Sequence, residues 1–398
     1  MRGLLRYLNF SQRGQRSLRT GVILSSFISL FLGDTAMAAA NPLLTLRQKI
    51  GQMIMVGFEG TKLGDKGVDD ILPHVRKGEI GGLVFFRYNI TSPQQIQLLT
   101  SAFRQAASSS HLPLLLAVDQ EGGKVQRLSS KNGFEDFPSA ETVAKTLTPQ
   151  QAYTQYRSMA HMVKSAGFNM NFGPVVDLRG SPHDPSHKPV CPVIGQLERS
   201  FSDQIETIVI YATSFIKAHH EEGIIPSPKH YPGHGLARTD SHKGMVDITL
   251  TYKPFERKPF QSLIQQGYAD IIMCAHLIDR HEDSRYPITL SSRFILPKLR
   301  KEDGFQGVVI TDDLHMGAIQ QHYSLKETVI RAIQAGNDIL LFSNNIAAAQ
   351  GVKDFKLKPN LVEQIITLIL NAVKEGTISQ ARIEESFERI KSLKRRLR

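Results

Sequence analysis

Cysteine is scarce in this chain, and its histidines lack the partners of a metal site. Among 398 residues there are two cysteines, Cys191 and Cys274. A single pair excludes the disulfide-dense scaffolds of small secreted proteins, and the sequence leaves open whether these two thiols pair. Cys274 lies in an apolar run, where a buried, unreactive thiol is expected. Because His230 and His234 lack the further ligands of a zinc site, we expect no metal ion, and no motif indicates another cofactor.

A hydrophobic run long enough to cross a bilayer, about 20 residues, is missing from the N-terminal region. The apolar run Gly21–Gly33 is shorter; it follows five arginines and precedes the mostly small residues Ala36–Ala40. These three parts are typical of a secretory signal. We therefore expect residues 1–40 to be a signal peptide, cleaved after Ala38 or Ala40, and the protein to be exported to the periplasm or outside the cell. An uncleaved membrane anchor is the alternative.

Nucleic-acid motifs with interleaved basic and aromatic residues are also missing. The formal net charge is +11, of which residues 1–40 carry +4 and residues 41–398 carry +7. Part of this excess lies in the basic segment Lys391–Arg398, where it suits the C-terminal end of a helix. The alternative is a loose attraction to an anionic polymer such as a cell wall or nucleic acid. We expect no nucleic-acid partner and no membrane partner beyond the export signal.

Eight short apolar runs recur after residue 40, separated by segments of helical length. Several runs are continuously apolar rather than alternating, as expected of parallel strands covered on both faces. The expected strands are Ile50–Phe58, Gly82–Phe86, Leu114–Val118, Phe168–Val176, Gly223–Pro226, Ala269–Ala275, Gly307–Thr311 and Asp338–Phe342. The expected helices are Ser92–Ser108, Pro149–Ala166, Asp203–Glu221, Pro254–Gln266, Ser324–Ala335, Asn360–Lys374 and Ser379–Arg396.

This alternation predicts an α/β fold, a single-domain (β/α)8 TIM barrel over residues 41–398. An open doubly wound sheet is the alternative, but no glycine-rich phosphate motif follows an early strand. Polar residues directly follow six of the expected strands or lie close behind them: Arg87, Asp119, Asp177, Lys229-His230, His276 and Asp312-Asp313. The C-terminal strand ends of such a barrel carry the active site, so we expect these side chains to converge on one rim.

The segment Lys229–Gly235, followed by Asp240-Ser241-His242, concentrates histidines in a loop. Its proline and glycines exclude a core helix or a central strand, so its imidazoles are expected to face a cleft. Asp240 is close enough in the chain to hold the ring of His242 in one tautomer and to stabilise its charged form. Such a pair is suited to proton transfer.

Two adjacent carboxylates, Asp312 and Asp313, end an expected strand, where successive side chains point to opposite sides. One can face the barrel mouth while the other caps a helix or binds a cation; alternatively, both cap the helix that begins near His315. A carboxylate with a separate proton donor meets the requirement for retaining glycoside hydrolysis. Asp119 and Arg127 could both reach a sugar, or could form a salt bridge that stabilises their loop.

These motifs resemble those of the family-3 glycoside hydrolases, and within that family the bacterial β-N-acetylhexosaminidases that recycle peptidoglycan. The resemblance runs in order over Leu44–Arg398 and rests on four segments: Val118–Arg127, Lys229–Gly235, Asp240–His242 and Thr311–Met316. It implies that Asp312 is the nucleophile and His242 the general acid/base, with Asp240 orienting it. It implies contacts to the non-reducing sugar from Asp119, Arg127, Arg199, Lys229 and His230, and a structural role for Asp177.

The resemblance therefore predicts an exo-acting β-N-acetylglucosaminidase that acts on terminal β-linked N-acetylglucosamine in peptidoglycan or chitin fragments. Alternatives are another family-3 exo-β-glycosidase, a phosphorylase, or a noncatalytic wall-binding protein. The chain departs from the family pattern at His315, at Lys124 and in the insert Ser181–Cys191, which we expect to reshape the side of the site beyond the cleaved sugar. We expect a monomer.

Overall fold

The computed structural model describes residues 44–110, 112–346, 352, 355–358 and 360–397. The expected signal peptide, residues 1–40, lies outside the described residues. Residues 44–398 form one compact unit. Within the described ranges, no helix combines the length and apolar character that a membrane span requires.

Parallel strands form the centre of this unit. Six of them pair side by side in the order β12-β1-β2-β3-β6-β7. Their bounds are β1 Ile54–Val56, β2 Gly82–Phe85, β3 Leu115–Val118, β6 Met170–Asn171, β7 Ile225–Pro226 and β12 Leu340–Phe342. Two further strands, β9 (Ile271–Cys274) and β11 (Val308–Thr311), pair with each other in parallel.

Isolated backbone pairings close the sheet into a barrel. The segment after β7 pairs with β9, because Tyr231 lies opposite Cys274 and the Met273 amide donates to the Pro228 carbonyl at 3.1 Å. Ile310 of β11 pairs in parallel with Ile339, next to β12. The predicted eight-stranded (β/α)8 barrel is therefore confirmed, and the open doubly wound sheet is not the fold.

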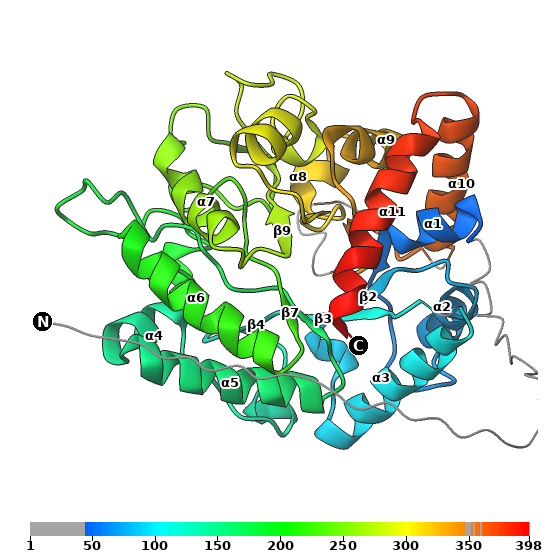
Figure 1. Ribbon diagram of the computed structural model, residues 1–398, viewed down its shortest axis with the longest axis horizontal. Coiled ribbons are helices and arrows are strands. Elements are labelled where there is room, and N and C mark those ends of the chain that lie inside the picture. The colour runs from blue at the N-terminus through cyan, green and yellow to red at the C-terminus, as the bar shows by residue number, and fades with distance from the viewer. Residues whose placement is uncertain (1–43, 111, 347–351, 353–354, 359, 398) are drawn as a thin grey trace, which may run out of the picture. The chain divides into compact units, whose positions relative to one another are not determined.

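Helices lie around the strands and cover their outer faces (Figure 1). Their bounds are α1 Leu46–Gln52, α2 Lys66–Arg76, α3 Pro93–Ser108, α4 Ala140–Thr146, α5 Pro149–Ser165, α6 Ile205–Glu221, α7 Lys258–Gln265, α8 Gly317–Gln320, α9 Leu325–Ala335, α10 Leu361–Lys374 and α11 Gln380–Lys394, with a π-helix at Ile295–Glu302. Short strands in the connections are β4 Gln120–Gly122, β5 Val125–Gln126, β8 Val246–Asp247 and β10 Leu277–Ile278. Short 3₁₀ helices lie at Arg87–Asn89, Ser130–Asn132, Gly195–Leu197, Pro254–Arg257, Ile288–Leu290 and Arg395–Leu397.

Capping residues explain where several helices begin. Ser92, Thr148, Ser324 and Ser379 each accept a hydrogen bond from a backbone amide in the first turn of α3, α5, α9 and α11. Such caps satisfy amides that have no partner inside the helix. Proline at the first position of α3 and α5 fits the same helix starts, because it has no amide hydrogen to satisfy.

Most expected strands are shorter than predicted, and two of them have less than half the predicted length. The run Ile50–Phe58 begins inside α1 and forms a strand only at Ile54–Val56. The run Phe168–Val176 is a strand only at Met170–Asn171, and the chain then turns at Gly173-Pro174. Apolar composition marked both regions as buried, but it cannot distinguish a buried helix turn or loop from a strand.

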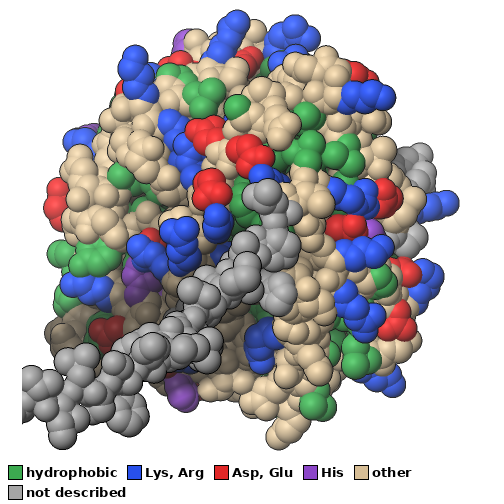
Figure 2. Space-filling view, turned by 45° about the vertical axis from the view of Figure 1, so that its right-hand side comes forward, with side chains coloured by type: hydrophobic (Ala, Val, Ile, Leu, Met, Phe, Trp, Pro, Cys, Tyr) green, Lys and Arg blue, Asp and Glu red, His purple; other side chains and the backbone are tan. Residues whose placement is uncertain are grey.

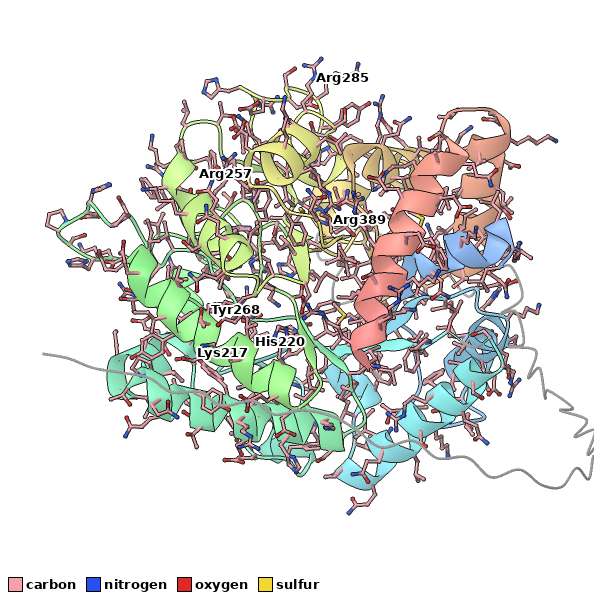
Figure 3. The ribbon with its side chains drawn as sticks, viewed as in Figure 1. Lys217, His220, Arg257, Tyr268, Arg285 and Arg389 are labelled. Atoms are coloured by element: carbon pink, nitrogen blue, oxygen red, sulfur yellow. The ribbon has the colours of Figure 1, made fainter. Side chains whose placement is uncertain are left out.

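A buried carboxylate joins the C-terminal helix to the barrel. Asp338 is fully buried beside β12, and its oxygens accept from Arg300 at 2.6 Å, Arg382 at 3.2 Å and Arg389 at 3.3 Å. Arg389 lies on the side of α11 that faces the interior (Figure 3). Ser386 of α11 also donates to this carboxylate, at 2.8 Å.

Replacing Asp338 with alanine is expected to lower the free energy of unfolding by about 3–5 kcal/mol, because the arginines would lose a buried counter-charge. Chemical denaturation followed by circular dichroism measures this change. The control is Asp70→Ala, which removes a carboxylate that pairs with Lys66 at 2.6 Å on the surface of α2. Its loss should stay below about 1 kcal/mol, and an equal loss for both variants would contradict the role assigned to Asp338.

Candidate active site

A cavity of about 610 Å³ opens at the C-terminal ends of the barrel strands. All eight side chains that the sequence predicted for the site line it: Asp119, Arg127, Arg199, Lys229, His230, Asp240, His242 and Asp312. Of the other strand-end residues, Arg87 and Asp313 also line the cavity, whereas Asp177 and His276 are buried outside its lining. The expected convergence of strand ends on one rim therefore holds for most of these residues.

Asp312 follows β11 and is held by its backbone. Its amide donates to the carbonyl of Cys274 at 2.9 Å, and its Oδ1 accepts from the amide of Asp313 at 2.8 Å. Burial raises the pKa of this carboxyl, but the neighbouring imidazoles of His276, His230 and His242 outweigh that effect, and the pKa lies below its usual value. Asp312 is therefore an ionised carboxylate in the cavity wall at neutral pH.

The carboxylate of Asp313 accepts hydrogen bonds from backbone amides. Its Oδ1 accepts from the amides of Ser343 at 2.7 Å and His315 at 3.1 Å, which ties the end of β11 to the end of β12. Burial raises the pKa of Asp313 to about 6. The alternative that both aspartates cap the next helix is wrong, because α8 begins at Gly317 and no side chain caps it.

His242 and Asp240 form the predicted pair. Asp240 Oδ1 accepts from the His242 backbone amide at 2.9 Å and lies 2.8 Å from Nδ1 of the His242 ring. In this contact, Nδ1 of His242 donates its proton to the Asp240 carboxylate. The other ring nitrogen, Nε2, has no hydrogen-bond partner among the described residues. Burial lowers the pKa of His242, but the hydrogen bond to Asp240 and the charge of Asp312 outweigh it and raise the pKa above its usual value.

The loop that carries His242 rests on the segment that follows Asp312. The carbonyl of His242 accepts from the Gly317 amide, and the carbonyl of Ser241 accepts from the Ala318 amide, each at 3.3 Å. These amides belong to the first turn of α8, where intrahelical acceptors are missing. Backbone hydrogen bonds therefore join the loop of the candidate proton donor to the segment that follows the candidate nucleophile.

A network of buried and half-buried charges lies on another wall of the cavity. Lys229 Nζ is 3.0 Å from Asp119 and 2.7 Å from Glu121, and Arg127 donates to Asp119 at 3.0 Å. Arg199 donates to both oxygens of Glu121 at 2.8 Å. Asp119 and Arg127 therefore form the salt bridge that was the alternative to sugar binding, and both residues also line the cavity.

Glu121 was not singled out by the sequence as a site residue, and its place in this network explains its role. Burial raises the pKa of Glu121, but the charges of Arg199 and Lys229 outweigh it and lower the pKa to about 2. A carboxyl so strongly ionised cannot donate a proton near neutral pH. Glu121 therefore acts as a counter-charge that holds Arg199 and Lys229 in place.

His230 is oriented from behind by Asp177. The ring Nδ1 of His230 lies 2.6 Å from Asp177 Oδ2, and Asp177 Oδ1 accepts from the His234 amide at 2.8 Å. The other ring nitrogen, Nε2, lies 3.4 Å from a guanidinium nitrogen of Arg199. Asp177 thus fixes both the loop backbone and the face that His230 presents to the cavity.

Residues beyond the predicted set also line the cavity. Tyr88 is 41% exposed and stacks on Phe86, with ring centroids 5.8 Å apart. Arg87 and Lys124 are exposed at the cavity, and neither forms an ion pair with a described residue. The run Phe86-Arg87-Tyr88 at a strand end was a usable signal, because aromatic and basic groups side by side often bind sugars or anions.

One group of metal-ligand types lies elsewhere in the described chain, at His74, Glu79 and Glu363. Arg47 pairs with both of these glutamates, and His74 Nδ1 lies 2.7 Å from Glu79. The guanidinium of Arg47 supplies the positive charge that a cation would bring. This group does not line the cavity.

Cys191 and Cys274 are both buried and free, so the structure contains no disulfide between them. Burial raises the pKa of the Cys191 thiol to about 12, and Cys191 Sγ lies 3.3 Å from Nδ1 of His234. We expect neither thiol to react with Ellman's reagent in the native protein and both to react after denaturation, because only the exposed thiolate is nucleophilic. Rapid reaction of a native thiol would contradict this burial.

Comparisons with known proteins agree with the barrel and its cavity. Residues 45–393 match the profile of the family described as "Glycosyl hydrolase family 3 N terminal domain". The chain is 30% identical to beta-hexosaminidase A of Pseudoalteromonas piscicida, over 92% of this chain and 64% of that relative. It is 34% identical to the beta-hexosaminidase of Haemophilus influenzae, over 73% of this chain and 79% of that relative.

A solved structure is similar as well. The glycoside hydrolase family 3 beta-N-acetylglucosaminidase from Paenibacillus sp. strain FPU-7 matches with a TM-score of 0.77 and 32% identity, over 89% of this chain and 63% of that chain. The chain thus spans less than two thirds of the Pseudoalteromonas and Paenibacillus proteins. The family profile nevertheless covers almost all of the described barrel, and the chain belongs to glycosyl hydrolase family 3.

Proposed function

We propose that the protein is an exo-acting β-N-acetylhexosaminidase that releases terminal β-linked N-acetylglucosamine with retention of configuration. The observation that carries this proposal is the shared cavity of Asp312 and the His242–Asp240 pair. The names of the relatives, a beta-hexosaminidase and a beta-N-acetylglucosaminidase, support the sugar specificity.

In the first step, a carboxylate oxygen of Asp312 attacks the anomeric carbon and the bond to the glycosidic oxygen breaks. His242, in its protonated form, gives the proton on Nε2 to the departing oxygen. In the second step, His242 takes a proton from water, the water oxygen attacks the anomeric carbon, and Asp312 is released as a carboxylate. Two displacements at one carbon return the original configuration.

The charges around these two groups suit this division of roles. A nucleophile must be ionised while the donor carries its proton. The pKa of Asp312 lies below its usual value and that of His242 lies above its usual value, and both directions favour an ionised nucleophile beside a protonated donor. Asp240 stabilises the imidazolium and holds Nδ1, which leaves Nε2 for the substrate.

The charge network would bind the hydroxyl groups of the terminal sugar. Asp119 accepts hydrogen bonds, whereas Lys229 and Arg127 donate them, so alternating sugar hydroxyls can be satisfied in a fixed array. His230 and Arg199 lie next to this array, 3.4 Å from each other. Because their partners already hold them in place, little side-chain freedom would be lost on binding.

Two cations that line the cavity without a described carboxylate partner favour an anionic group on the substrate. Arg87 and Lys124 line the cavity without a carboxylate partner in the described structure. Peptidoglycan fragments carry carboxylates next to N-acetylglucosamine, whereas chitin fragments are neutral. We therefore favour peptidoglycan fragments over chitin fragments as the substrate.

The double variant Arg87→Gln, Lys124→Gln is expected to raise KM for an anionic muropeptide by about 3- to 10-fold, since exposed charge pairs contribute little each. Its KM for neutral chitobiose should stay unchanged, and this neutral substrate is the internal control. Initial rates measured at low ionic strength provide both values. Equal effects on the two substrates would argue against recognition of an anion.

The cellular location of the protein is also proposed. We propose that residues 1–40 direct export and that residues 41–398 act as a monomer in the periplasm or outside the cell. On the face shown in Figure 2, basic and acidic side chains are interspersed and do not form one large basic surface. The mass of the protein recovered from its own cell shows whether the signal is cleaved.

A direct test of the proposed activity compares aryl β-N-acetylglucosaminide with the matching aryl β-glucoside. We expect hydrolysis of the first to be strongly preferred, with the β-anomer as the first product in a proton NMR time course. Preference for the glucoside, or the α-anomer as first product, would overturn the proposed specificity or the proposed mechanism. Acceleration by phosphate with release of a sugar phosphate would identify a phosphorylase instead.

A further inference from the structure

A second pocket, separate from the active-site cavity, is lined by three arginines. It has a volume of about 370 Å³, and Arg285, Arg293 and Arg331 all line it. None of their guanidinium groups forms an ion pair with a described carboxylate. Guanidinium groups that are not neutralised within the protein are suited to bind an oxyanion through paired hydrogen bonds.

Much of the pocket comes from the segment that follows β10. Arg285 follows β10, which pairs in parallel with β8, and β8 begins four residues after His242. Tyr323, which lies after α8, donates its hydroxyl to the carbonyl of Arg285 at 2.8 Å. Arg285 stands at the outer edge of the molecule, where a ligand can approach from solvent (Figure 3).

Two of the three cations lie over the same buried aromatic ring. The guanidinium of Arg331 lies 4.4 Å, and that of Arg285 5.5 Å, from the ring centroid of Tyr286. Tyr286 is only 8% exposed, and its hydroxyl donates to Glu327 at 3.1 Å. The ring attracts each cation through its π-face, so Tyr286 positions both guanidinium groups at the pocket before any ligand arrives.

The described lining of the pocket contains a single acidic residue, and that residue is occupied by the loop itself. Asp283 accepts from the hydroxyl of Ser291 at 2.6 Å and from the amides of Arg285 at 2.9 Å and Tyr286 at 3.2 Å. It shapes the loop and offsets one of the three positive charges. The pocket lining therefore keeps a net charge of +2.

We propose that this pocket binds a phosphate group, either free or carried on a sugar or polyol. A phosphate monoester has a charge of about −1.5 to −2 near neutral pH, which matches the charge of the lining, whereas a carboxylate would offset only half of it. Three planar guanidinium groups also provide more donors than the two oxygens of a carboxylate can accept. The proposal does not depend on the glycosidase activity.

Isothermal titration calorimetry of the full chain at low ionic strength tests the proposal with inorganic phosphate, glycerol 3-phosphate and acetate. We expect both phosphates to bind more tightly than acetate. Arg285→Gln and Arg331→Gln should each weaken phosphate binding by about tenfold, which corresponds to the loss of one charge-assisted contact. Arg331→Lys, which keeps the charge but loses the planar fork, should fall between Arg331→Gln and the unaltered protein.

The control Arg76→Gln removes the same charge from the exposed surface of α2, away from the pocket lining, and should leave binding unchanged. Thermal unfolding without ligand shows whether each variant is folded. Tighter binding of glycerol 3-phosphate than of phosphate supports a carried phosphate, and equal binding supports the free ion. Acetate binding as tight as phosphate, equal loss in Arg76→Gln, or phosphate binding that survives in the double variant Arg285→Gln, Arg331→Gln would overturn the proposal.

Discussion

Replacing Asp312 with asparagine is expected to reduce kcat for an aryl β-N-acetylglucosaminide by about 10⁴-fold or more, as the loss of a nucleophile does in other enzymes. The amide has nearly the same shape but lacks the negative charge that attacks the anomeric carbon. The Asp313 amide that donates to Asp312 at 2.8 Å can still donate to the amide oxygen, so the local fold should persist. Stopped assays at high enzyme concentration measure the residual rate.

Binding separates a lost nucleophile from a lost site. Asp312→Asn should still bind N-acetylglucosamine with nearly unaltered affinity, because Asp119, Lys229 and Arg127 form their own network on another cavity wall. Asp313→Asn is the matched control, since its carboxyl holds backbone amides rather than facing the reacting carbon. If Asp313→Asn removed as much activity as Asp312→Asn while remaining folded, the two roles would have to be exchanged or shared.

The second large effect concerns proton transfer. His242→Ala should lower kcat/KM for a natural disaccharide by about 10²- to 10⁴-fold, the usual range for a lost general acid. For a substrate whose leaving group needs no proton, such as 2,4-dinitrophenolate, the first step should be nearly unaffected. A comparison of the two substrates in the same variant therefore isolates the role of His242 as proton donor.

Asp240→Asn should change the pH profile as well as the rate. The hydrogen bond and charge of Asp240 raise the pKa of His242. Without them this pKa falls, the acid form of His242 is lost at lower pH, and the alkaline limb of kcat/KM must move toward acid pH. The sign is fixed by the direction of the shift: a limb that stays in place or moves to higher pH would show that another group donates the proton.

Asp240 itself is kept ionised by the same contact, because its hydrogen bond with His242 lowers its pKa. Asp247→Asn is a suitable control, since it removes a carboxylate on the same loop whose partner is the exposed Arg280 at 2.7 Å. It should leave the alkaline limb unchanged.

The barrel could be predicted because its strands are continuously apolar and its helices begin at readable caps. β3, β9 and β11 are fully buried along their length, so composition alone reveals them. Helix α2 was missed because Pro73 lies inside it, although its four buried apolar residues recur at helical spacing. The strand after Phe168 was overestimated because loops beneath an active site are buried as well.

The site residues were predictable where motif and fold agree, and not where function depends on distant partners. Asp240 and His242 are two residues apart, so their pairing can be anticipated from the chain. Glu121 becomes meaningful only through Arg199, 78 positions away, and through Lys229 on a different strand end. The pocket of Arg285, Arg293 and Arg331 likewise depends on the folded path of the chain around Tyr286.

The most direct test of this account traps the sugar on the enzyme. A 5-fluoro derivative of N-acetylglucosamine with an activated leaving group should form its covalent intermediate faster than water releases it. After proteolysis, mass spectrometry should find the added sugar on the peptide that contains Asp312, and none in Asp312→Asn. A sugar attached to another residue, or active turnover that never yields an attached sugar, would contradict the assignment of Asp312 as the nucleophile.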